Sequence, residues 1–183
     1  MKAIVQERYG SPDDLELREV EKPVVGDDDV LVQVRAASVH PDVWHVVTGR
    51  PYVLRLMGAG VSRPKNPVPG TDTAGIVESV GKGVTRFRPG DPVFGETIAT
   101  QQWINGGAFA EYVSVPQDLL ALKPDNITFQ QAASVHSLAG KRREPSILAA
   151  RSLLVRFKRD VASSMRRFHR AQFRTWRHFG PRR

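Results

Sequence analysis

Prolines divide the first 135 residues into segments that are too short for long helices. Ten of them lie between residues 23 and 124, at positions 23, 41, 51, 64, 67, 69, 89, 92, 116 and 124. A proline inside a helix removes a backbone hydrogen bond and clashes with the preceding turn. Short segments rich in β-branched and aromatic residues lie between these prolines, spaced by about ten residues. This pattern predicts a mainly β fold, built as a small barrel or sandwich.

Five segments carry the pattern of strands. Residues 30–36 alternate apolar and polar side chains, as a half-buried strand does. The other four are residues 2–6, 15–20, 73–80 and 108–115, and the last offers Phe109, Tyr112, Val113 and Val115 for a core.

Glycine-containing turns connect several of these segments. Residues 10–13 separate the first two strands, and residues 88–92 lead into a short strand at 93–95. Gly81 and Gly83 end the 73–80 strand, and we expect them to supply the positive φ that a tight hairpin requires.

Two short helices are expected between the strands. One runs from Asp42 to about Thr48, and the other starts at Thr128. Asn126 or Thr128 is the expected N-cap of the second helix, with glutamines in its first turn, because side-chain oxygens at this position satisfy free backbone amides.

The charge of the chain changes sharply after Val135. Residues 1–135 carry 13 Lys and Arg against 17 Asp and Glu, whereas residues 136–183 carry 14 against 2, so their net charges are −4 and +12. We therefore expect one domain, residues 1–135, and an Arg-rich tail, residues 136–183, that is helical or disordered. The apolar side chains of a basic amphipathic helix recur there at Leu153, Phe157, Val161, Met165 and Phe168.

Composition excludes several classes of site. The chain has no cysteine, which excludes disulfides, thiolate zinc sites and a cysteine nucleophile. The first residues lack the apolar core of a secretory signal, and no run approaches the ~18 apolar residues of a membrane span. A cytoplasmic protein without a transmembrane segment is therefore expected.

Motifs in residues 1–135 occur in a distinctive order. They are MKAIV at the start, VLVQVRAASV at 30–39, PGTDTAGIV at 69–77, VGKGV at 80–84, FRPGDPVFG at 87–95 and GGAFAEY at 106–112. This order resembles the catalytic domain of the medium-chain dehydrogenase/reductase superfamily, and within it the zinc-independent quinone oxidoreductase group, which includes zeta-crystallin-like proteins. The resemblance implies a GroES-like, partly open β-barrel with short helices, followed by the tail.

The resemblance also implies a Rossmann domain, which binds the nicotinamide cofactor in this superfamily. Residues 128–133 resemble the helix that leads into it, but no Gly-x-Gly-x-x-Gly or -Ala follows. Gly58-Ala59-Gly60 lies in a Pro-rich loop and Gly81-Lys82-Gly83 in a turn, so neither has the strand-to-helix context of a phosphate cradle. We therefore expect that the Rossmann domain is absent, that the chain is truncated or frameshifted, and that it does not bind NADPH alone.

In zinc-free relatives, the segment after the third strand lines the cleft that faces the nicotinamide. Here this segment contains the candidate cleft residues His40, Asp42, Trp44, His45 and Tyr52. A histidine or a tyrosine hydroxyl there could donate a proton or polarise a carbonyl, and the alternative is that these side chains only cap and pack. The resemblance implies that the substrate in this cleft is a quinone or an α,β-unsaturated carbonyl.

Zinc-dependent members of the superfamily hold the metal with residues at the positions of His40 and Thr71-Asp72. Because catalytic zinc requires three protein ligands, His40 and Asp72 are weak metal candidates and no zinc is expected.

The role of the tail and the association state of the chain stay open. The tail could bind nucleic acid or an anionic surface, or it could be an arbitrary Arg-rich product of a frameshift. The chain could also associate with itself, or with an intact relative, through the exposed face of the barrel.

Overall fold

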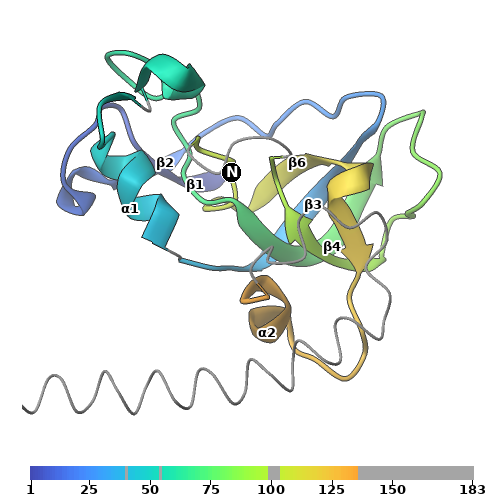
Figure 1. Cartoon of the computed structure of the whole chain (residues 1–183). Helices are drawn as coiled ribbons and strands as arrows, with labels where there is room; N and C mark the ends of the chain where they lie inside the picture. The colour runs from blue at the N-terminus through green and yellow to red at the C-terminus, as the bar shows by residue number, and fades with distance from the viewer. Residues whose placement is uncertain (40, 54, 99–103, 136–183) are drawn as a thin grey trace, which may run out of the picture. The chain divides into compact units, whose positions relative to one another are not determined.

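The computed structural model describes residues 1–39, 41–53, 55–98 and 104–135, which form two antiparallel β-sheets with short helices (Figure 1). The mainly β prediction is therefore confirmed. The strands are β1 Lys2–Val5, β2 Glu16–Glu19, β3 Asp29–Ala37, β4 Asp72–Val80, β5 Pro92–Glu96, β6 Tyr112–Pro116 and β7 Leu120–Leu122. The helices are η1 Pro12–Asp14, α1 Pro41–Thr48, η2 Arg55–Ala59, η3 Gln117–Leu119 and α2 Phe129–Ala133.

Five strands form the larger sheet in the order β6-β3-β4-β5-β7. The two long strands β3 and β4 pair at its centre, from Val30 opposite Val80 to Ala37 opposite Thr73. Within the described strands, β6 and β7 stay unpaired with each other, so this sheet is open. The hairpin β1–β2 is joined to its neighbourhood by a bridge between Ala3 and Ala110.

Alternation along the strands builds the main core. Val30 and Val32 point to one face of β3, and Val113 and Val115 point to the same side from the neighbouring β6, since side chains two apart share a face. Phe87 and residues of β4, β5 and β7 complete this cluster. Tyr112 faces the other way: its hydroxyl accepts from Gln33 Nε2 at 3.2 Å. Of the side chains offered by residues 108–115, only the two valines therefore reach the main core.

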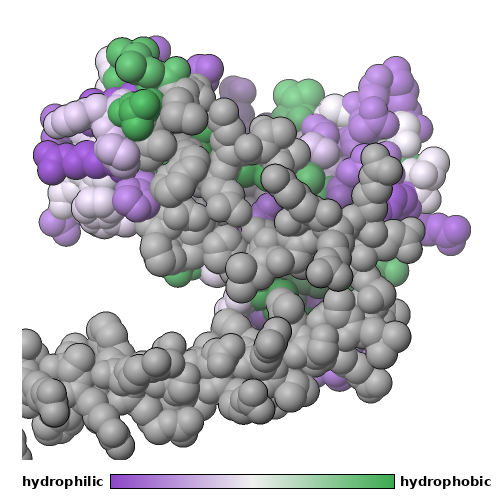
Figure 2. Space-filling model, viewed as in Figure 1, coloured by the Kyte–Doolittle hydropathy of each residue, from purple (hydrophilic) through white to green (hydrophobic). Residues whose placement is uncertain are grey.

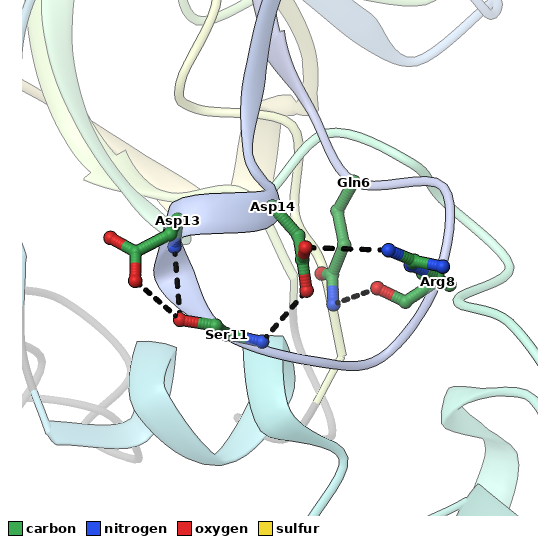
Figure 3. Close-up of polar contacts among 5 residues, drawn as sticks. All are labelled: Gln6, Arg8, Ser11, Asp13 and Asp14. Carbon is green, nitrogen blue, oxygen red and sulfur yellow. Dashed lines mark hydrogen bonds and ion pairs between the residues drawn. The ribbon is translucent and has the colours of Figure 1, made fainter.

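A smaller core lies under the first hairpin. It consists of Ala3, Val5 and Val68, and Phe109 packs against them. The loop after β1 is closed by a capping box, in which the amide of Ser11 donates to Asp14 Oδ2 at 3.0 Å and the amide of Asp13 donates to Ser11 Oγ at 3.2 Å (Figure 3). The predicted turn at residues 10–13 is thus a short 3₁₀ helix, because serine satisfies the free amides at its start.

The prediction for Gly81 and Gly83 was wrong in its reason. Neither glycine has a positive φ. The glycine with a positive φ in this region is Gly90, at φ 94°, in the turn that leads into β5. A Cβ on Gly81 would lie 2.1 Å from the carbonyl oxygen of Gly26 and 2.3 Å from that of Asp27. Glycine is required here because another backbone segment passes close by, which local sequence does not reveal.

The helix α2 begins as expected at its N-cap. Thr128, and not Asn126, is the capping residue: the amide of Gln131 donates to Thr128 Oγ1 at 3.1 Å, and the amide of Thr128 donates to Gln131 Oε1 at 3.0 Å. α2 packs against β3, β4 and β5 (Figure 1).

The predicted helix in residues 136–183 lies outside the described residues. Among the residues that the structure does describe, no helix is long and apolar enough to cross a membrane.

Candidate functional site

The end of β3 and the start of β4 bring two polar side chains together. Because Ala37 pairs with Thr73, Ser38 lies beside Asp72, and its hydroxyl donates to Asp72 Oδ2 at 3.0 Å. Thr71 Oγ1 lies 3.5 Å from the same oxygen, and Asp72 is only 3% exposed. The carboxylate is therefore held by hydroxyl donors inside the protein, at the corner where the resemblance places the zinc ligands of other members.

The turn before β4 fixes the position of this carboxylate. Gly70 has φ 87°, and a Cβ there would lie 2.4 Å from the Phe109 ring. Its carbonyl oxygen accepts from the amides of Gly106 and Ala108, each at 3.1 Å. Only glycine fits this tightly bonded turn, so the backbone that leads into Asp72 is rigidly placed.

Replacing Ser38 by alanine removes a hydrogen bond to this buried carboxylate. We expect the free energy of unfolding to fall by about 2 kcal/mol, because hydrogen bonds to charged groups contribute more than neutral ones. Urea denaturation measures the change. Ser62→Ala is the matched control, since Ser62 is exposed, and equal effects of the two substitutions would contradict the assignment.

The helix α1 carries three of the candidate cleft residues, Asp42, Trp44 and His45. Its buried face is formed by Val43, Val46 and Val47, whereas Trp44 is 52% exposed. The rings of Trp44 and His45 meet edge to face, with centroids 5.1 Å apart. His45 Nδ1 lies 2.8 Å from the carbonyl oxygen of Arg50. Since a carbonyl only accepts, Nδ1 carries the proton, and this ring nitrogen is engaged in closing the turn after the helix.

Buried amides tie α1 to the end of β1. Gln6 is 1% exposed, and its Nε2 donates to the carbonyl oxygens of Val47 at 2.6 Å and Arg8 at 3.1 Å. Its Oε1 accepts from Asn105 Nδ2 at 3.2 Å, and the same nitrogen lies 2.7 Å from the carbonyl oxygen of Asn66. Three segments far apart in the sequence therefore meet under the helix.

Arg55 also holds the C-terminal end of α1. Its Nε donates to the carbonyl oxygen of Gly49 at 3.0 Å, and one Nη reaches that of Thr48 at 3.4 Å. The guanidinium also lies over the rings of Tyr9, at 4.3 Å, and Tyr52, at 4.8 Å. A cation at the C-terminal end of a helix is favourable, and stacking on two rings orders it. Arg55 thus sets the position of Tyr52, whose side chain is 63% exposed.

Burial raises the pKa of the Tyr9 phenol above its ordinary value, and the positive charge of Arg55 opposes part of that rise. The hydroxyl donates to the carbonyl oxygen of Gly60 at 2.8 Å.

The raised pKa of Tyr9 makes the stability depend on alkaline pH. The unfolded chain ionises this phenol near pH ~10, before the folded chain does. The stability from the neutral phenol is thus complete below that pH and is lost as pH rises through the higher folded pKa. We expect wild type to lose more stability than Tyr9→Phe above pH ~10; parallel pH curves from urea denaturation would refute this.

The predicted site residues do not all meet in the described structure. Trp44 and His45 are in contact with each other. The ring of Tyr52 lies beside arginines, with the Arg50 guanidinium 6.0 Å from its centroid. His40 and the side chain of Asp42 lie outside the described residues. In the part of the chain that the structure describes, no group of three or more His, Asp or Glu side chains could hold a metal. His40 and Asp72 stay weak metal candidates, and the expectation that no zinc binds them stays a prediction.

Sequence reasoning missed three residues that organise this region, Ser38, Gln6 and Arg55. A hydroxyl directly after a strand was a weak signal for Ser38. Gln6 and Arg55 gave none, because each acts through carbonyl oxygens that only the fold brings near.

A family model described as the alcohol dehydrogenase GroES-like domain matches residues 26–125, more than half of the chain. The chain belongs to this family. The resemblance to the medium-chain dehydrogenase/reductase superfamily, and the GroES-like fold that it implied, are thereby confirmed.

Curated and solved GroES-like relatives agree with this assignment. The chain is 37% identical to an NADPH-dependent alkenal/one oxidoreductase of Arabidopsis thaliana and 33% identical to a quinone oxidoreductase of Sus scrofa, covering 74% of this chain but 34% and 37% of those proteins. The structure of the quinone oxidoreductase from Coxiella burnetii matches with a TM-score of 0.64 and 30% identity, over 74% of this chain and 40% of that one. The chain thus spans about a third of the length of the curated relatives it matches.

Proposed function

We propose that residues 1–135 are the substrate-side domain of an NAD(P)H-dependent reductase of quinones or α,β-unsaturated carbonyls. The observation that carries this proposal is the match over 74% of the chain to relatives named for alkenal/one and quinone reduction. The residues matched by the family model, 26–125, include β3, β4 and the Ser38–Asp72 corner between them. Residues 136–183 are an Arg-rich tail outside this domain.

We further propose that the chain of 183 residues does not hold the cofactor by itself. Of its two Gly-x-Gly stretches, neither has open space for a pyrophosphate. A Cβ on Gly60 would lie 2.1 Å from the carbonyl oxygen of Arg63, and one on Gly81 would meet that of Gly26 at the same distance. The chain's own backbone fills the space that a nucleotide phosphate requires.

Tyr52 is the candidate in the segment after β3 that best suits contact with a substrate. Its side chain is 63% exposed, and the described contacts of its ring, with the guanidinium groups of Arg50 and Arg55, do not engage its hydroxyl. His45 suits this role less well, because its Nδ1 donates to the carbonyl of Arg50. We assign Tyr52 the role of donating a hydrogen bond to the oxygen of a quinone or enone, which polarises the carbonyl.

Two experiments test these proposals. Calorimetric titration of the whole chain with NADPH should give no binding, and measurable binding would refute the second proposal. For the first, residues 1–135 are joined to the part of the Coxiella burnetii quinone oxidoreductase that this chain does not cover. The chimera should oxidise NADPH in the presence of a quinone, and a folded chimera without this turnover would argue against the proposed function.

The same chimera tests Tyr52. We expect Tyr52→Phe to lower kcat about 100-fold, the lower range for loss of a general acid or polarising group. Tyr112→Phe is the matched control, because its hydroxyl is engaged by Gln33 on the other face of β6. Equal turnover of Tyr52→Phe and the parent chimera would remove Tyr52 from the site.

A further inference from the structure

The segment that follows α1 is cationic in a domain that is otherwise acidic. Residues 49–71 contain Arg50, Arg55, Arg63 and Lys65 and no Asp or Glu, while the remainder of residues 1–135 has a net charge of −8. Among the described residues, the ion pairs of the domain involve other cations, such as Lys82 with Asp27. This local charge is therefore not neutralised by carboxylates nearby.

The segment has a defined shape. The amide of Gly60 donates to the carbonyl oxygen of Arg55 at 3.3 Å, and the amide of Lys65 donates to that of Ala59 at 3.0 Å. Tyr9 fastens it to the first hairpin through its bond to the carbonyl of Gly60 at 2.8 Å. These bonds fold residues 55–65 back on themselves, so their exposed side chains project from a held backbone.

Aliphatic side chains project from the same segment. Val53, Leu56 and Val61 are 53%, 76% and 68% exposed. Figure 2 shows hydrophobic side chains gathered at the end of the domain where Figure 1 draws η2. Arg50, Arg63 and Lys65 are also exposed. We call these six residues the 50–65 surface.

We propose that the 50–65 surface docks on a lipid bilayer that contains anionic headgroups. Aliphatic side chains flanked by Lys and Arg are the pattern of interfacial binding, in which the apolar groups enter the headgroup region while the cations attract anionic lipids. Charge complementarity selects this occupant, since the surface carries cations alone. The exposed aliphatic groups favour lipid over duplex nucleic acid, because a duplex binds mainly through its phosphates and would leave Val53, Leu56 and Val61 without apolar partners.

This inference is independent of the proposed reductase activity, and its test needs neither cofactor nor turnover. The 14 Lys and Arg of residues 136–183 are a second possible source of attraction to anionic vesicles. The experiment must therefore report on the 50–65 surface itself.

The absence of cysteine allows one fluorophore to be placed at a chosen position of the whole chain. Leu56→Cys carries an environment-sensitive dye on the surface, and Val24→Cys, at a side chain 91% exposed elsewhere, carries it as the matched control. Vesicles of phosphatidylcholine and phosphatidylserine should shift the emission of the Leu56 label to shorter wavelength and protect it from iodide, leaving the Val24 label unchanged. Vesicles of phosphatidylcholine alone should have little effect.

Vesicle sedimentation measures the partition coefficient between water and the lipid vesicles. Arg63→Gln and Lys65→Gln should each lower the partition coefficient about five-fold, and Leu56→Ser should lower it about ten-fold or more. Circular dichroism confirms that each variant is folded.

Several outcomes would overturn the proposal. The chain could sediment with vesicles while the Leu56 label stays unchanged, which would assign binding to the tail. The Leu56 label could shift with rising protein concentration without vesicles, which would assign the surface to a second copy. A shift on adding duplex DNA but not vesicles would assign it to nucleic acid.

Discussion

Replacing Gly75 by alanine is expected to lower the free energy of unfolding by about 3 kcal/mol or more. A Cβ on Gly75 would lie 2.1 Å from the carbonyl oxygen of Gln33 and 2.8 Å from Val32 Cγ1. The first of these atoms belongs to the backbone of the paired strand, which cannot rotate away as the end of a side chain can. β3 and β4 would have to separate at the centre of the larger sheet, next to the bulge between Val34 and Ala36.

Urea denaturation of Gly75→Ala measures this loss, and Gly90→Ala separates the steric effect from backbone strain. Gly90 has φ 94° and no atom within 4 Å of an added Cβ. Its replacement should therefore cost only the conformational penalty, about 1–2 kcal/mol. If Gly75→Ala is no more destabilising than Gly90→Ala, the close approach of the two strands is not as the structure has it.

Replacing Gln6 by leucine should cost about 3 kcal/mol, through lost hydrogen bonds and not through lost volume. The substitution keeps a side chain of similar size in a site that is 1% exposed, but it removes the bonds to Val47, Arg8 and Asn105. The buried amide of Asn105 then loses an acceptor, and burying a polar group without partners is costly.

The location of the effect is as informative as its size. Because the carbonyl of Val47 belongs to α1, amide hydrogen exchange in that helix should accelerate in Gln6→Leu before global unfolding. Gln130→Leu is the control, on the exposed side of α2. A uniform change of exchange across both sheets would mean that Gln6 does not hold α1 in particular.

Both residues position the candidate site without belonging to it. Gly75 lies in β4, three residues after Asp72, and Gln6 holds the helix that carries Trp44 and His45. Variants of either should therefore disturb the site only through the scaffold. That distinguishes them from Tyr52→Phe, which should leave stability nearly unchanged and act on turnover.

Local patterns predicted the elements well and their contacts poorly. Alternation located β3, β-rich composition located β4, and the residues around Thr128 located the start of α2, because these signals depend on neighbours within a few positions. The roles of Gly81 and Gly83 were misread, since the atoms that exclude a side chain there come from residues 26–28. A glycine in the sequence does not show whether it is required by a positive φ or by another backbone segment that passes close by.

In the candidate site too, the sequence predicted the segments but not the contacts between their side chains. The segment after β3 and the Pro-Gly turn before β4 were both identified from their motifs, and pairing of Ala37 with Thr73 brought them together. That Ser38 would donate to Asp72, 34 positions away, depended on the register of the two strands. A slip of one residue would have turned one of the two side chains to the opposite face.

The spacing and residue types along the chain were sufficient to predict a mainly β domain. The resemblance of its motifs to a known family added the GroES-like fold and the segments of the candidate site. Which side chains hold that site was set only when the chain folded. Gln6 contacts Asn105 across 99 positions, and Arg55 contacts carbonyl oxygens that carry no side-chain identity. The backbone presents the same groups at every residue, so such contacts leave no pattern in the sequence and follow from three-dimensional packing alone.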